Sequence, residues 1–251
     1  FALNKIFQLN ISLKDLALIS KKVENEFIGV NCGIMDQFAV AMGKKDKAIL
    51  LNCETLEHEY IPFQTGNYSL AIINSNKQRT LLGSKYNERF TECGAALRAL
   101  KKKIPIQNLC DLDMKTFETY RYLIEHPVLQ KRALHVISEN ERVGYAVNAL
   151  KKNDLLQFGQ LMFVSHQSLK EDYEVSGREL DTIIEFCKTY SGCIGARMTG
   201  AGFGGCAIAL IQNERFADFS EKLISYYKEL IGYAPAPFVT EVGDGVKQVT
   251  L

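Results

Sequence analysis

The sequence predicts an α+β fold. Segments with apolar residues at helical spacing alternate with short apolar runs that are typical of strands, and several of these runs follow one another as hairpin-like pairs. Of the 251 residues, 47% are hydrophobic and 24% are charged, which is enough apolar material for a real core. The Gly66-Asn67 turn divides the chain into two predicted domains, residues 1–66 and 67–251.

The first predicted domain begins with helices and continues with a pair of strands. Residues 1–26 have helical periodicity that Asn10 interrupts, and Ser12 is expected to cap a second helix, whose apolar side carries Leu16, Leu18, Ile19 and Val23. A glycine-containing loop follows, and then a short helix from about Asp36 to Met42 that Gly43 ends. Strands are expected at 47–52 and 57–63.

The second predicted domain mixes long helices with short strands. A buried strand is expected at 68–73, followed by a helix at 84–103 whose inward residues are Phe90, Ala95, Ala96, Leu97 and Leu100. The remaining helices are expected at 114–124, 128–151, 153–170, 176–190 and 214–230. Strands are expected on both sides of a glycine-rich turn within 194–211, and again at 237–242 and 246–250.

Composition argues against several classes of partner. Since 30 basic residues face 29 acidic ones, the net charge is +1, and no field is expected that would recruit nucleic acid or a membrane surface. The longest apolar runs are too short to span a bilayer. The seven cysteines are scattered without a CxxC pair, which favours reduced thiols in the cytoplasm over disulfides or a zinc site.

Asp36 is the one acid between Gly29 and Ala39, where it follows a turn and has apolar neighbours. Because charged residues are rarely buried without a partner, we expect it at a rim or in a polar pocket. Local sequence leaves two interpretations open. The commoner one is a helix N-cap; the other is a carboxylate in a cleft that takes a proton from a hydroxyl group.

The stretch from Met198 to Cys206 is rich in glycine and lies between two apolar runs. Glycines let backbone amides approach a ligand, so the residues that we single out for phosphate binding are Gly200, Ala201, Gly202, Gly204 and Gly205. The spacing also matches the dinucleotide fingerprint, but a strand follows where that fingerprint needs a helix. A tight hairpin without any ligand is the alternative.

Polar residues gather at the end of the 68–73 strand and at the start of the next helix, in the segments 74–79 and 84–89. Strand ends are usual places for ligands. Tyr86 could present its hydroxyl group to a sugar or serve as an amphipathic core residue. His135 and His166 fall on helices beside apolar neighbours and have no metal-ligand spacing, so both are interpreted as structural and no metal ligand is assigned.

Five segments in the same order resemble the galactokinases, which belong to the GHMP family of small-molecule kinases. In the galactokinases, the first of these segments holds the catalytic aspartate and the second holds a tyrosine that touches the sugar. The last segment resembles a glycine-rich loop that lies near their active site. These segments are residues 29–39, 84–89, 131–140, 158–169 and 197–206. The resemblance covers nearly the whole chain.

The resemblance implies a GHMP-kinase-like fold, with a remnant of the N-terminal domain and a ferredoxin-like C-terminal domain with extra helices. It also implies transfer of a phosphoryl group from ATP, with Mg²⁺, to the C1 hydroxyl of α-D-galactose in the cytoplasm. Asp36 would take or steer the hydroxyl proton, while Gly33, Asp36 and Tyr86 would line the sugar pocket. The loop from Gly200 to Gly205 would support the phosphate side.

The sequence departs from the galactokinase pattern in one respect. It contains neither the Gly-Glu-His-Thr-Asp sugar motif nor the Gly-Leu-Ser-Ser-Ser-Ala phosphate motif of that family. Phe1 aligns just beyond the second motif, so we expect a C-terminal two-thirds that is inactive alone. The complete form is expected to be a monomer, whereas this piece would expose apolar surface and sheet edge and could self-associate.

Two other functions remain open at this point. One is a galactokinase-like sensor or binding module that binds ligand without turnover. The other is a GHMP kinase with a different sugar or alcohol, which would keep the glycine-rich loop but should not keep the 131–140 and 158–169 segments.

Overall fold

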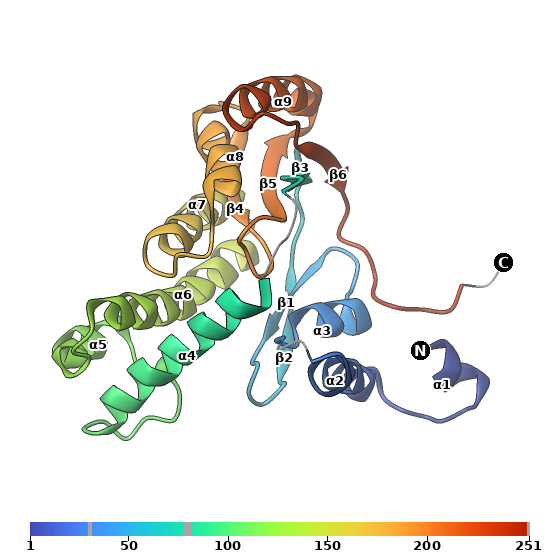
Figure 1. The fold of residues 1–251 in the computed structure, drawn as a ribbon. Coiled ribbons are helices and arrows are strands. Elements are labelled where there is room, and N and C mark those ends of the chain that lie inside the picture. The colour runs from blue at the N-terminus through green and yellow to red at the C-terminus, as the bar shows by residue number, and fades with distance from the viewer. Residues whose placement is uncertain (30–31, 78–81, 250–251) are drawn as a thin grey trace. The chain divides into compact units, whose positions relative to one another are not determined.

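The computed structural model describes residues 1–29, 32–77 and 82–249 (Figure 1). These form two compact units. The first comprises Phe1–Gln64 together with Glu241–Leu251, and the second comprises Thr65–Thr240. The division after residue 64 lies close to the boundary expected after residue 66, but the last residues of the chain join the first unit rather than the second.

The first unit consists of helices followed by a β-hairpin. The hairpin strands pair antiparallel, with Ile49 opposite Tyr60. Ser12 caps the second helix as expected, because its hydroxyl oxygen accepts a hydrogen bond of 3.1 Å from the Asp15 amide. The elements are α1 (Ala2–Ile6), α2 (Leu13–Lys22), a π-helical turn η1 (Val23–Ile28), α3 (Met35–Met42), β1 (Lys47–Leu51) and β2 (His58–Pro62).

The core of this unit is small. Its buried members are Ala17, Ile34, Phe38 and Ala41, against which side chains of the β1 strand pack. Many large apolar side chains of the same unit stay exposed, as expected from the sequence. They are Leu3, Ile6, Phe7, Leu9, Leu18, Ile19, Val23, Phe27, Ile28, Met35 and Val40.

The chain end was predicted to form a strand at 246–250, and this prediction is wrong for residues 246–249. Those residues carry no strand, and 250 lies outside the described residues. Instead, the Gly245 amide donates to the Gly43 carbonyl at 2.7 Å and the Val246 amide to the Val40 carbonyl at 2.8 Å. The end of helix α3 therefore takes up these amides, and no neighbouring strand is needed to satisfy them.

The second unit contains the sheet and most of the helices. Short 3₁₀ turns lie at Leu109–Asp111, Arg121–Leu123 and Asn213–Arg215. The main elements are β3 (Tyr68–Asn74), α4 (Leu82–Lys101), α5 (Met114–Tyr120), α6 (Pro127–Lys151), α7 (Leu155–Glu171), α8 (Arg178–Thr189), β4 (Cys193–Met198), β5 (Cys206–Gln212), α9 (Phe216–Ile231) and β6 (Ala236–Thr240).

The sheet has the strand order β4-β5-β3-β6, and every neighbouring pair is antiparallel. With α4 to α8 in the first crossover and α9 in the second, this is the split β-α-β arrangement of ferredoxin-like folds, as expected. Helices α7 and α8 pack on β4, whereas α4 and α5 pack on α6 (Figure 1). No helix in the described part of the chain is long and apolar enough to cross a bilayer.

One residue of α4 contradicts the predicted inward face. Phe90 was expected to point inward, but its side chain is 75% exposed. The neighbouring Arg89 is buried instead, because the Glu92 carboxylate and the carbonyl group of Tyr173 accept its hydrogen bonds. Helical periodicity of apolar residues cannot reveal a charged residue that is buried by such partners.

The backbones of helix α7 and strand β4 are in direct contact at Gly159 and Gly195. A Cβ atom added to Gly159 would lie 2.2 Å from the Ile194 carbonyl oxygen, and one added to Gly195 would lie 2.2 Å from the Gly159 Cα atom. Both positions therefore require glycine, because any side chain would force the helix away from the strand.

We predict that Gly159→Ala lowers the free energy of unfolding by about 2–3 kcal/mol, because the added methyl group overpacks this contact. The matched control is Gly144→Ala on the exposed side of α6, where an added Cβ meets nothing within 4 Å. That change should raise the free energy by about 0.5–1 kcal/mol through helix propensity. Urea unfolding followed by circular dichroism measures both; equal effects would contradict the packing argument.

Candidate functional site

Asp36 is the second residue of α3 and is exposed. The interpretation as the N-cap is wrong, since Ile34 occupies that position and provides no side-chain cap. A carboxylate in the first turn is instead stabilised by the helix dipole, by about 0.3–1 kcal/mol. Asp36 is thus at the surface, which agrees with the expectation that it lies at a rim.

A cavity of about 350 Å³ lies beside Asp36 within the first unit. Its walls are mostly apolar, and its polar groups come from Asp36 with Ser20, Glu24 and Gln37. The remaining lining residues are Phe1, Leu16, Ala17, Val40, Ala41 and Val246. A carboxylate at the mouth of an apolar hollow is placed to receive a hydrogen bond from a bound hydroxyl group.

The residues that lead into α3 are tied to the π-helical turn η1. The Cys32 amide donates to the Asn25 side chain at 3.1 Å, and the Cys32 thiol donates to Glu24 at 3.3 Å. Burial, and then Glu24, raise the pKa of this thiol, which keeps it a donor. Gly33 follows in open space and is exposed. Residues 30 and 31 of the same segment lie outside the described residues.

The glycine-rich turn joins β4 to β5 and is built from left-handed residues. Gly200, Gly202, Gly204 and Gly205 have φ values of 75°, 82°, 124° and 83°, which glycine adopts without steric cost. Among the described residues, no backbone carbonyl accepts a hydrogen bond from the amides of Gly200, Ala201 or Gly204. A turn with such amides can accommodate an anion.

Neighbouring segments fix the shape of this turn. The Phe203 amide donates to the Val175 carbonyl at 2.7 Å, and the Ser75 amide donates to the Gly205 carbonyl at 2.8 Å. Two lysines lie beside it. Lys77 packs against Gly204 and pairs with Glu179 at 2.9 Å, and the Lys85 ammonium lies 5.2 Å from the centre of the Phe203 ring. The turn is therefore packed against Lys77, whose charge Glu179 balances, and Lys85 adds a second ammonium group beside it.

Tyr86 lies in the first half of α4 and is half-buried. Its neighbourhood includes Tyr173, whose pKa is raised by burial and further by Cys93 and Tyr86. The residue before it, Lys85, reaches the glycine-rich turn, so the structure brings the Tyr86 segment and that turn together within the second unit. Gly33 and Asp36 lie together in the first unit. Residues 78 and 79 of the predicted polar segments lie outside the described residues.

The two histidines interpreted as structural are both buried and hydrogen-bonded. His166 Nε2 lies 3.2 Å from the Asp181 carboxylate, and its Nδ1 accepts from the Met198 amide at 3.3 Å. His135 Nδ1 lies 3.0 Å from the Ser168 hydroxyl oxygen, and its ring stacks on Tyr173. Within residues 1–29, 32–77 and 82–249, no cluster of three or more His, Cys, Asp or Glu side chains could hold a metal ion.

Comparison with known families gives two matches along the chain. The model for the GHMP kinases N terminal domain matches residues 1–44, and the model for the GHMP kinases C terminal matches residues 146–229. The chain belongs to the GHMP kinase family. The ferredoxin-like second unit is the fold that this assignment requires.

Two galactokinases are similar to this chain over nearly its whole length. A galactokinase of Staphylococcus carnosus (strain TM300) is 49% identical over 249 residues, which is 99% of this chain and 64% of the relative. The crystal structure of Lactococcus lactis galactokinase complexed with galactose matches with a TM-score of 0.96 and 43% identity, over 99% of this chain and 64% of that one. The chain thus spans somewhat less than two thirds of the length of these relatives.

A more distant match shows the fold alone. The structure of L. major mevalonate kinase in complex with R-mevalonate matches with a TM-score of 0.61 at 21% identity, over 98% of this chain and 63% of that one. This chain and the mevalonate kinase therefore share a fold.

The groups that hold the site residues in place carry little signal in the sequence. Val175, whose carbonyl accepts from the glycine-rich turn, carries no signal because any residue type offers that carbonyl. Arg89 and Arg132 are buried, and the one available signal was a pair of basic residues at apolar helical positions. Only their partners in space distinguish them from surface arginines.

The tautomer of His135 follows from its partners. Ser168 donates its one hydroxyl proton to Asp172 at 2.8 Å, so the His135 Nδ1–H must be the donor to the Ser168 oxygen. Burial, together with the charges of Arg142, Arg197 and Arg132, lowers the pKa of His135 to about 3. The imidazole is therefore neutral at ordinary pH.

We predict that the His135 ring does not titrate between pH 8 and pH 5. Because the unfolded chain binds this proton near pH 6.5 and the folded chain does not, stability should fall as the pH drops from 6.5, by about 2 kcal/mol at pH 5 from this group alone. Histidine C2-proton NMR measures the titration, with His135→Gln assigning the signal. A titration midpoint near 6.5 would contradict the buried network, as would a loss of stability between pH 6.5 and pH 5 that is the same in His135→Gln as in the wild type.

Proposed function

We propose that this chain is the larger part of a galactokinase, which transfers the γ-phosphoryl group of ATP to the C1 hydroxyl of α-D-galactose. The observation that carries the proposal is 49% identity to a galactokinase across 99% of the chain, with Asp36 exposed at the start of α3. The fold match to a galactokinase complexed with galactose supports the same substrate.

In this proposal Asp36 takes the proton of the C1 hydroxyl or steers it electrostatically. An exposed carboxylate beside a hollow can accept that hydrogen bond without first losing an internal partner. Gly33 would approach the sugar closely, since open space surrounds its Cα atom. Tyr86 would offer its hydroxyl group or its ring to the same ligand.

The glycine-rich turn would serve the phosphate side of the reaction. Its amides at 200, 201 and 204, and the neighbouring Lys85, suit the negative charge of the ATP phosphates. The family resemblance implies Mg²⁺ as well. The described residues offer no cluster of acids for that ion, so we assign it no ligand in this chain and derive no step through it.

The chain alone would lack part of this site. It spans 64% of the length of the Staphylococcus carnosus relative and contains neither of the two motifs that bind sugar and phosphate in galactokinases. Because phosphoryl transfer depends on positioning and charge stabilisation, loss of those groups should abolish turnover.

We also propose that the protein is cytoplasmic and binds neither nucleic acid nor a membrane. Its net charge is +1, and its seven cysteines are free thiols.

We predict no detectable ADP release by the purified chain with ATP, Mg²⁺ and galactose. Fusing the part of the Staphylococcus carnosus galactokinase that precedes the segment similar to Phe1 should restore galactose-dependent turnover. In that fusion, Asp36→Asn should lower kcat by about 100-fold or more, because the new amide cannot accept the proton. A coupled ADP-release assay measures each step.

Two controls make this test decisive. R-mevalonate as acceptor should give no turnover in the fusion, and the complete Staphylococcus carnosus enzyme serves as the positive control. A folded fusion that phosphorylates no galactose would contradict the proposed function. Turnover by the chain alone that disappears in Asp36→Ala would contradict the incomplete site.

We further predict that the chain alone self-associates through the exposed apolar side chains of α2 and η1, although a complete enzyme would be monomeric. Ile19 is 47% exposed and Phe27 is 88% exposed. Light scattering after size exclusion should therefore show a mass above that of a monomer, and this mass should fall when the protein is diluted. The double variant Ile19→Lys with Phe27→Ser should shift the mass to a monomer, whereas Phe90→Ser in the second unit should not. A monomer at every concentration would refute the prediction.

A further inference from the structure

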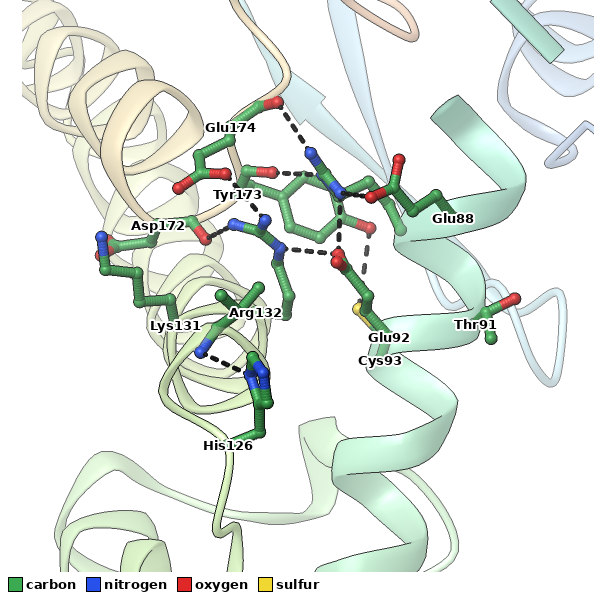
Figure 2. Close-up of polar contacts among 12 residues, drawn as sticks. Glu88, Thr91, Glu92, Cys93, His126, Lys131, Arg132, Asp172, Tyr173 and Glu174 are labelled. Carbon is green, nitrogen blue, oxygen red and sulfur yellow. Dashed lines mark hydrogen bonds and ion pairs between the residues drawn. The ribbon is translucent and has the colours of Figure 1, made fainter. Parts of the chain in front are cut away.

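Arg132 on α6 is a buried charge, and each of its three guanidinium nitrogens donates to a partner (Figure 2). The residue is 2% exposed. Its Nε atom donates to Glu92 at 2.7 Å, and its Nη2 atom donates to the Glu174 carboxylate at 2.9 Å. The Nη1 atom donates to the backbone carbonyl of Asp172 at 2.6 Å. Such a planar fork fixes direction as well as distance.

Arg89 on α4 contacts the same segment. Its Nε atom donates to the Tyr173 carbonyl at 2.7 Å, and its Nη2 atom donates to the Glu174 carbonyl at 3.3 Å. Its Nη1 atom donates to the same Glu92 oxygen that Arg132 contacts, at 2.8 Å. We call Arg89, Glu92 and Arg132 the arginine clamp.

The two arginines of the clamp donate hydrogen bonds to three successive carbonyl groups, those of residues 172, 173 and 174, in the connection between α7 and α8. Val175 follows immediately, and its carbonyl accepts from the Phe203 amide of the glycine-rich turn. The approach is so close that a Cβ atom at Gly202 would lie 2.1 Å from the Val175 carbonyl oxygen. The position of the turn is thus set by a segment that the clamp holds.

The clamp also contains two residues of the helix that carries Tyr86. Arg89 lies three residues after Tyr86, so it is about one helical turn away on a neighbouring part of the same face. The 173–175 segment is therefore connected to the Tyr86 helix through Arg89 and to the glycine-rich turn through Val175.

We propose that Arg89, Glu92 and Arg132 are positioning residues that hold the glycine-rich turn and the Tyr86 helix in their mutual geometry. The part of this proposal that concerns catalysis rests on the proposed function. Apolar side chains could fill the same volume at similar stability, but they could not fix the direction of three consecutive carbonyls. The clamp therefore acts on the turn through the backbone and does not touch the substrate.

The direct test measures hydrogen exchange of backbone amides in this chain. In Arg132→Lys, which keeps the charge but loses the fork, the Phe203 amide and the 199–205 peptide should exchange about tenfold faster or more, while amides of β3 and β5 keep their rates. Arg89→Lys and Glu92→Gln should act in the same way. The matched control is Arg121→Lys, because Arg121 pairs with Glu118 and makes no contact with the clamp.

Gly202→Ala supplies an independent comparison, since it pushes the turn off the Val175 carbonyl without changing the clamp. It should reproduce the local exchange of Arg132→Lys. If the Phe203 amide of a folded Arg132→Lys variant keeps the wild-type rate, the proposal is overturned. It is also overturned if the turn and the β3 and β5 amides accelerate equally, because the clamp would then support only general stability.

The catalytic part is tested in the fusion with the Staphylococcus carnosus segment. Arg132→Lys should lower kcat about tenfold with little change in the KM for galactose, whereas Arg121→Lys should leave both unchanged. Faster exchange of the turn with an unchanged kcat would overturn the catalytic part alone. A fusion without galactose turnover would reject the proposed function, while the exchange experiment would still decide the positioning role.

Discussion

The pairing of β3 with β5 is the constraint on which the second unit depends. These two strands lie in the middle of the sheet, with Ala71 opposite Ala209, and both of those residues are fully buried. The pairing brings together segments that are separated in sequence by all the helices from α4 to α8. Burial of both strands between neighbours offsets the entropy of closing so long a loop, which grows only slowly with loop length.

The same pairing of β3 with β5 positions the glycine-rich turn of the candidate site. The ladder extends beyond the last strand residues, because the Ser75 amide donates to the Gly205 carbonyl. The glycine-rich turn therefore ends where β5 begins, beside the end of β3. Ser75 is also held by Tyr227, whose hydroxyl group donates to the Ser75 carbonyl at 2.8 Å. The arginine clamp then fixes the other side of the turn through Val175. Backbone contacts, rather than side chains of the turn, decide its shape.

The sequence was sufficient for what local chemistry determines. Ser12 capped its helix, and the four left-handed glycines formed the expected turn, because each of these features depends on residues close in the chain. It was not sufficient where distant partners decide. Arg89 faces inward in place of Phe90, because a carbonyl group beyond the end of α7 accepts its hydrogen bond. Helix α3 begins at Met35, one residue earlier than expected, so Ile34 and not Asp36 is the N-cap. The amides of Gly245 and Val246 found acceptors at the end of α3 instead of in a strand.

The hydroxyl group that receives the phosphate decides whether this chain belongs to a galactokinase. ³¹P NMR of the product formed from ATP and galactose by the fusion with the Staphylococcus carnosus segment reports which proton couples to the new phosphate. We expect coupling to the anomeric proton of an α-galactose 1-phosphate. Phosphate on another hydroxyl of the sugar, or transfer to a different alcohol in preference to galactose, would contradict it.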